Sequence, residues 1–129
     1  MAKGYPLRRP SVADVMEVPS AGRAPEELVR QYFEALRRGR VVDALDVFST
    51  DAVLWDEAGT EHRGIRAIAA SFVHGRSPTR ISLISVIRSD RDIATIAEIR
   101  RTLSAPPIRY RAVFSIDQGR VRSLTMTRL

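Results

Sequence analysis

The last fifty residues of this 129-residue chain alternate between apolar and polar side chains with a period of two, as half-buried strands do. The alternation is clearest over residues 108–116. One face of that strand would carry Ile108, Tyr110, Ala112, Phe114 and Ile116, and the other Arg109, Arg111, Val113 and Ser115. Turn-forming residues divide this part of the chain, so we expect strands at 81–88, 93–103, 108–116 and 121–128, joined as three hairpins in a meander.

Before these strands, apolar residues recur at the spacing of a helix. Pro25 followed by two glutamates is typical of a helix start, and Gly39 is a suitable end. A second, shorter helix is expected next, with three apolar residues facing inward: Val42, Leu45 and Phe48. We then expect a strand at 52–56 and a third helix that starts after Gly64 and ends at Gly75.

Helices gathered first and strands last indicate the α+β class. We expect a cone-shaped barrel, in which a curved, mostly antiparallel sheet packs on three N-terminal helices. Residues 1–24 contain three prolines and two glycines but little apolar content, so we interpret them as a flexible N-terminal extension. The remainder, residues 25–129, is expected to form one domain.

Composition excludes several classes of function. The chain has no cysteine, and its two histidines have no acidic ligand at metal spacing, so neither a disulfide nor a metal site is expected. No apolar run approaches the roughly 18 residues of a membrane helix, and the N-terminus does not resemble a secretory signal, which favours a cytoplasmic protein. The net charge of +6 suggests a basic surface on the C-terminal part. Without interleaved aromatic residues or a binding motif, a nucleic-acid partner is not expected.

Four segments resemble the nuclear transport factor 2-like (SnoaL-like) superfamily in amino-acid sequence and in spacing along the chain. They are residues 29–36 (VRQYFEAL), 44–53 (ALDVFSTDAV), 62–68 (HRGIRAI) and 114–121 (FSIDQGRV). The resemblance covers about residues 25–129 and implies a cone with a pocket for a small apolar molecule. Because this superfamily includes isomerases, dehydratases, epoxide hydrolases, polyketide cyclases and non-catalytic binding domains, it leaves the activity open.

Within that superfamily, ketosteroid isomerase implies two catalytic residues. Its oxyanion donor, a tyrosine on the first helix, resembles Tyr32, and its general-base aspartate at the end of the first strand resembles Asp56. Its second donor would fall at Ala112, which has no polar group, so Thr95 or Tyr110 would have to replace it. The alternative is structural: Asp56 opens a turn and Tyr32 belongs to the core.

Other side chains are candidates for contact with a substrate. His62 could exchange protons, because histidine titrates near neutral pH. The aromatic candidates serve either the core or the pocket, and they are Phe33, Trp55, Phe72, Tyr110 and Phe114. Trp55 should point away from Asp56, toward a helix or a subunit contact.

Two functional hypotheses remain. The first is a cofactor-independent isomerase, hydrolase or cyclase that acts on a small apolar carbonyl, epoxide or polyketide-like substrate. The second is a non-catalytic ligand-binding or dimerisation domain of the same fold. Both predict a homodimer through the outer sheet face, where Arg109 and Arg111 would need acidic partners such as Glu98.

Overall fold

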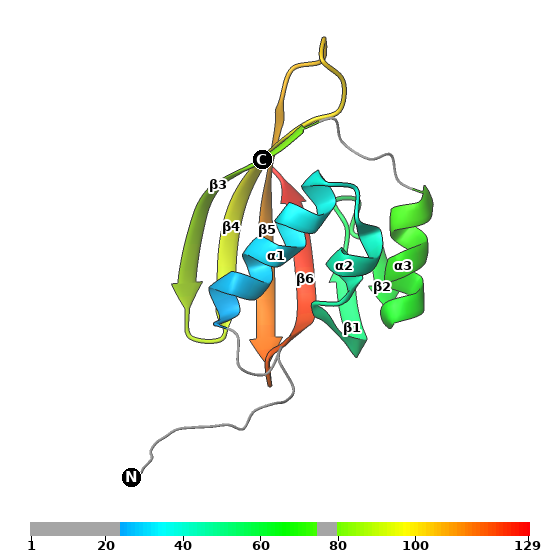
Figure 1. Ribbon diagram of the computed structural model, residues 1–129, viewed down its shortest axis with the longest axis vertical. Coiled ribbons are helices and arrows are strands. Elements are labelled where there is room, and N and C mark those ends of the chain that lie inside the picture. The colour runs from blue at the N-terminus through cyan, green and yellow to red at the C-terminus, as the bar shows by residue number, and fades with distance from the viewer. Residues whose placement is uncertain (1–23, 75–79) are drawn as a thin grey trace.

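A six-stranded sheet frames the computed structural model, which describes residues 24–74 and 80–129. The strands are β1 (Phe48–Trp55), β2 (Glu61–Arg63), β3 (Arg80–Ser89), β4 (Asp92–Arg100), β5 (Ile108–Asp117) and β6 (Arg120–Arg128). Their order is β2-β1-β6-β5-β4-β3, and only β1 and β6 pair in parallel. The predicted α+β class, curved antiparallel sheet and meander of the last four strands are confirmed (Figure 1). The curved sheet is open, because β2 and β3 lie at its two opposite edges and do not pair with each other. The predicted extension lies almost wholly in residues 1–23, outside the described part.

Three helices cover one face of the sheet, as predicted: α1 (Pro25–Arg37), α2 (Val41–Leu45) and α3 (Ile65–His74) (Figure 1). At the start of α1 the Glu27 carboxylate accepts the Ala24 N–H at 3.2 Å, which satisfies one of the free amides of the first turn. Gly39 follows α1 with a φ of +71°, a conformation that glycine adopts without strain. Within residues 24–74 and 80–129, no helix is long and apolar enough to cross a membrane.

The predicted second helix is wrong in extent, and one of its three apolar residues does not face inward, whereas Leu45 packs against the core and Phe48 is buried as predicted. Helix α2 spans only five residues, and Val42 is 80% exposed instead of facing inward. Phe48 does not belong to a helix, because it begins β1 and pairs with Val121 of β6. The Val121 N–H also donates to the Val47 carbonyl at 2.8 Å. Pairing with a strand more than seventy residues away therefore overrides the local helical spacing, and β1 starts four residues earlier than predicted.

The strand predicted at 93–103 is also shorter than expected. Strand β4 ends at Arg100, and Leu103 is 76% exposed in the connection that follows. Within this connection the Arg100 guanidinium donates to the Ala105 carbonyl at 2.7 Å. The side chain of Arg100 thus binds the backbone of the connection, and the chain leaves the sheet before Pro106 and Pro107.

The inner sheet face and α1 enclose a cluster of aromatic rings. Tyr32 is at its centre, with ring centroids between 5.4 and 6.3 Å from those of four phenylalanines. We call this set the aromatic cluster, and it consists of Tyr32, Phe33, Phe48, Phe72 and Phe114. Phe114 is fully buried, as the alternation along β5 predicts.

The outer sheet face carries the predicted arginines. Arg109 and Arg111 are exposed, and the Arg109 guanidinium lies 3.2 Å from the Glu98 carboxylate of β4, which confirms the predicted pair. Trp55 is half-buried, and the register places it beside Thr125 on this same face. Pairing of two subunits through this face stays a prediction.

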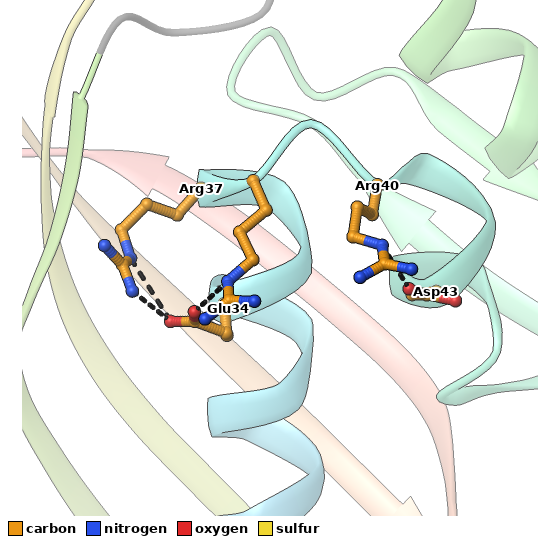
Figure 2. A network of polar contacts seen from close by, with 5 residues as sticks. Glu34, Arg37, Arg40 and Asp43 are labelled. Carbon is orange, nitrogen blue, oxygen red and sulfur yellow. Dashed lines mark hydrogen bonds and ion pairs between the residues drawn. The ribbon is translucent and has the colours of Figure 1, made fainter.

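Carboxylates balance part of the arginine surplus across the surface. The Glu34 carboxylate accepts hydrogen bonds from Arg37 and Arg38 at the end of α1, and Arg40 pairs with Asp43 (Figure 2). The bonds from Arg37, followed by those from Arg38, hold the pKa of Glu34 below its ordinary value. Exposed pairs of this kind contribute little to stability, but they neutralise charge that would otherwise attract an acidic partner.

Candidate functional site

A hollow of about 640 Å³ lies between α3, the end of β1 and the strands β4 to β6. Its apolar lining comes from Leu54, Ala67, Ala70, Phe72, Ile99 and Met126. Its polar lining comes from Asp56, Glu57, His62, Ser71, Arg101 and Tyr110. Half of these residues are polar, but most of the surface that lines the hollow is apolar, as is usual for a small-molecule site.

Asp56 and His62 form a hydrogen-bonded pair on the wall of this hollow. The His62 Nε2 atom lies 2.9 Å from the Asp56 Oδ2 atom. The other carboxylate oxygen, Oδ1, accepts the backbone N–H groups of Ala58 at 3.0 Å and Thr60 at 2.9 Å. The bond from His62, followed by that from Thr60, holds the pKa of Asp56 below its ordinary value. Asp56 is therefore a carboxylate at neutral pH.

The tight connection between β1 and β2 brings this pair together. The two strands are antiparallel, with Leu54 opposite His62, so His62 lies beside the point where β1 ends. The Gly59 N–H donates to the Asp56 carbonyl at 2.9 Å, and Gly59 has a φ of +82° that favours glycine. Asp56 thus opens the turn, as the structural alternative predicts, and binds His62 with its other oxygen.

This geometry assigns the protons of the imidazole. Because the Asp56 carboxylate only accepts hydrogen bonds, the bonded Nε2 of His62 carries a hydrogen, and in the neutral ring Nδ1 then holds the free lone pair. Within the described part of the chain, no other residue hydrogen-bonds this ring. The side chains of His62 and Asp56 are 21% and 35% exposed, so a small molecule can reach them. The pair can accept a proton at Nδ1.

Tyr110 and Glu57 form a second polar pair in the same hollow. The Tyr110 hydroxyl donates to the Glu57 Oε1 atom at 3.0 Å. Tyr110 comes from the inner face of β5 and is 3% exposed, whereas Glu57 is an exposed residue of the turn after β1. Together with His62 and Asp56, these residues form what we call the polar rim: Asp56, Glu57, His62 and Tyr110.

The structure does not bring Tyr32 to the polar rim. Its ring is 2% exposed at the centre of the aromatic cluster, and burial raises the pKa of its hydroxyl. Tyr32 is not among the residues that line the hollow, although it contacts Phe72, which is. The predicted convergence of Asp56 and Tyr32 is therefore replaced by that of Asp56 and His62.

The remaining candidates separate into core and lining residues. Phe33 and Phe114 belong to the aromatic cluster, Phe72 reaches the hollow, and Trp55 lies on the outer sheet face. Thr95 is fully buried, and its hydroxyl donates to the carbonyl of Ala112 at 2.8 Å. A hydroxyl has one hydrogen to donate, so Thr95 has none for a substrate.

Sequence reasoning missed three polar residues of the lining: Glu57, Ser71 and Arg101. Glu57 directly follows Asp56 at the end of a strand, a position that could have drawn attention to it. The Ser71 hydroxyl donates to the Ile68 carbonyl of its own helix at 2.6 Å. Within the described residues, no group of three or more histidine, aspartate or glutamate side chains could hold a metal ion.

A known protein family matches most of the described chain. Residues 29–124 match the family model of the SnoaL-like domain. A search of curated proteins finds no match.

Solved structures share the fold at low sequence identity. A protein from Sphaerobacter thermophilus is 23% identical with a TM-score of 0.73, and the match covers 82% of this chain and 96% of that one. A proposed polyketide cyclase from Sinorhizobium meliloti is 22% identical with a TM-score of 0.71, covering 78% and 94%. A proposed ketosteroid isomerase from Kribbella flavida is 12% identical with a TM-score of 0.70, covering 80% and 76%. At these identities the likeness establishes the fold alone.

Proposed function

Because this chain belongs to the SnoaL-like domain family, we propose that it is a cofactor-independent enzyme that moves a proton on a small apolar substrate. The single observation that carries the proposal is the Asp56–His62 pair, with 2.9 Å between Oδ2 and Nε2, on the wall of an apolar hollow. The substrate would be a carbonyl, an epoxide or a polyketide-like compound, and the reaction an isomerisation, a hydrolysis or a cyclisation. Solved neighbours described as a polyketide cyclase and a ketosteroid isomerase are consistent with this range.

His62 is the proposed base, and Asp56 is the residue that positions it. The Asp56 carboxylate already accepts three hydrogen bonds, whereas the Nδ1 atom of His62 keeps a lone pair. For a carbonyl substrate, Nδ1 takes a proton from the carbon beside the carbonyl. The C–H electron pair becomes a C=C bond, and the carbonyl π pair moves onto the oxygen. In a β,γ-unsaturated carbonyl substrate, return of the proton from His62 to the γ carbon isomerises the substrate. In a substrate with a second carbonyl, attack of the enolate on that carbonyl closes a ring, and the alkoxide that forms takes the proton back from His62.

Proton removal can be measured without knowing the natural substrate. The probes are apolar ketones such as 1-indanone and 2-tetralone in deuterium oxide, with hydrogen–deuterium exchange beside the carbonyl followed by NMR. We expect His62→Gln to lower the exchange rate by about 10²- to 10⁴-fold, the usual contribution of a general base. Glu61→Gln, a change on the same strand β2 outside the hollow, is the matched control and should leave the rate unchanged.

Two results would redirect the proposal. If His62→Gln exchanges the ketone hydrogens at the rate of the unmodified chain and Asp56→Asn does not, Asp56 itself is the base, as the ketosteroid isomerase resemblance implies. If the ketones bind but none exchanges, the chain is a ligand-binding domain. The structure offers one observation for that second function: the aromatic cluster fills the inner part of the cone with apolar rings, and Ala112 places no polar group there.

A further inference from the structure

Tyr110 is a buried residue of the hollow, and its hydroxyl donates a hydrogen bond to a residue of an exposed turn. Tyr110 is 3% exposed and lies on the inner face of β5, opposite Ala97 of β4. Its hydroxyl donates to Glu57 at 3.0 Å, a residue 53 positions earlier in the chain. Both residues line the hollow, so their bond lies in the space that a ligand would enter.

The turn that carries Glu57 does not depend on this bond. The Asp56 N–H donates to the Thr60 carbonyl at 3.1 Å, and the Asp56 carboxylate holds the amides of Ala58 and Thr60. None of these bonds involves the Glu57 side chain, which is on an exposed residue. The carboxylate of Glu57 can therefore swing into solvent while the backbone of the turn stays in place.

A carboxylate oxygen 3.0 Å from a pocket phenol occupies the position that a substrate oxyanion needs. Donors that stabilise a developing oxyanion lie about 2.7–3.1 Å from it. A phenol has a single hydrogen to donate, so Glu57 and a substrate oxygen compete for the same bond. Two anionic oxygens at this spacing would also repel each other, and Glu57 has to leave when the substrate oxygen arrives.

We infer that the Tyr110 hydroxyl binds a carbonyl or anionic oxygen of the substrate, and that the Glu57 carboxylate fills this position until the substrate displaces it. The inference rests on the proposed function for the direction of the reaction, since enolate formation by His62 would put negative charge on that oxygen. It narrows the substrate class to an apolar body with a carbonyl or enolisable oxygen. It also makes Glu57 an internal competitor that lowers the apparent affinity for such compounds.

The test is the affinity for 4-nitrophenolate, an oxyanion on an apolar ring that is not turned over. Its absorbance is titrated at pH 8 with the unmodified chain, Glu57→Ala, Glu57→Ala combined with Tyr110→Phe, and the control Glu61→Ala. Glu61 lies on β2 outside the hollow, so its replacement removes the same charge without removing the competitor. We expect Glu57→Ala to tighten binding by about 10- to 100-fold, the value of one hydrogen bond to a charged group, and Glu61→Ala to change it less than about twofold.

The double variant decides whether Tyr110 is the donor. Tyr110→Phe keeps the buried ring on the inner face of β5, and in the Glu57→Ala background it should abolish the gain by weakening binding about 10- to 100-fold. Unchanged or weaker binding by Glu57→Ala would overturn the inference, because Glu57 would then hold Tyr110 in place without competing. A double variant that binds as tightly as Glu57→Ala, or a probe that binds no variant, would overturn it as well. Because nothing is turned over, these results do not depend on whether His62 is a base.

Discussion

Two tyrosines with almost equal burial lie in opposite chemical surroundings. Tyr32 is 2% exposed and has aromatic rings around it, while Tyr110 is 3% exposed and its hydroxyl is bonded to Glu57. The first belongs to the aromatic cluster and the second to the polar rim. The difference teaches that burial alone does not distinguish a phenol of the core from one at the hollow, because the two differ in the hydrogen-bond partner of the hydroxyl.

On the proposed function, the polar rim carries the chemistry, whereas the aromatic cluster contributes most of its side chains to the stability of the fold. The largest expected effect of a single substitution on stability is therefore that of Phe114→Ala. Phe114 is fully buried, and its ring centroid lies 5.4 Å from that of Tyr32 and 5.8 Å from that of Phe33. Removing the ring should lower the free energy of unfolding by about 3–5 kcal/mol, measured by urea denaturation.

Phe72→Ala is the matched comparison for that experiment. Phe72 is only partly buried, and its ring lies farther from Tyr32, at 6.3 Å, where it also lines the hollow. Its loss should cost less stability than that of Phe114, because one side of the ring already faces the hollow and not the core. An equal or greater loss for Phe72→Ala would show that the part of the aromatic cluster that lines the hollow stabilises the fold as much as its fully buried part.

A smaller effect is expected from Tyr32→Phe. In the part of the chain that the structure describes, no residue hydrogen-bonds the Tyr32 hydroxyl, and burial of an unpaired hydroxyl is unfavourable. The variant should be as stable as the unmodified chain or more stable by up to about 1 kcal/mol, with its rate of ketone exchange unchanged. A loss of about 10²- to 10³-fold in exchange would instead show that Tyr32 is the oxyanion donor that the resemblance implies.

The fold was predictable where the signal is local. Alternation along residues 108–116 placed the inner and outer faces of β5 correctly, and Gly39 and Gly64 marked helix boundaries because their backbone conformations favour glycine. The second helix was mispredicted because Phe48 is fixed by Val121, a contact that no local pattern contains. Long-range strand pairing of this kind depends on the whole sheet.

The candidate site divides in the same way. Asp56 and His62 are six residues apart on one hairpin, so their pairing could have followed from the turn around Gly59. Glu57 and Tyr110 meet only because the curved sheet brings β5 to face the turn after β1. The resemblance directed attention to Tyr32, but which phenol reaches the hollow is decided by the packing of α1 against the sheet.

The smallest expected effect concerns the pH dependence that Asp56 adds to stability. Its pKa is lower in the folded chain than the ordinary 3.8, chiefly because of the bond from His62. The folded state therefore gains stability from Asp56 above about pH 4 and loses it as the pH falls through the lowered pKa. Asp56→Asn should remove this contribution, so its unfolding free energy should fall less between pH 6 and pH 2.5 than that of the unmodified chain.

The difference should stay below about 1 kcal/mol, because the Asp56 side chain is 35% exposed and its interaction with His62 is screened by solvent. Urea denaturation at the two pH values measures it, and the other carboxylates cancel when the two chains are compared. His62→Leu should remove most of the same pH dependence, since it deletes the largest cause of the lowered pKa. If His62→Leu kept the full pH dependence of stability, the backbone amides of the turn alone would lower the pKa of Asp56. The polar rim would then contain an aspartate that serves the turn and a histidine positioned by something else.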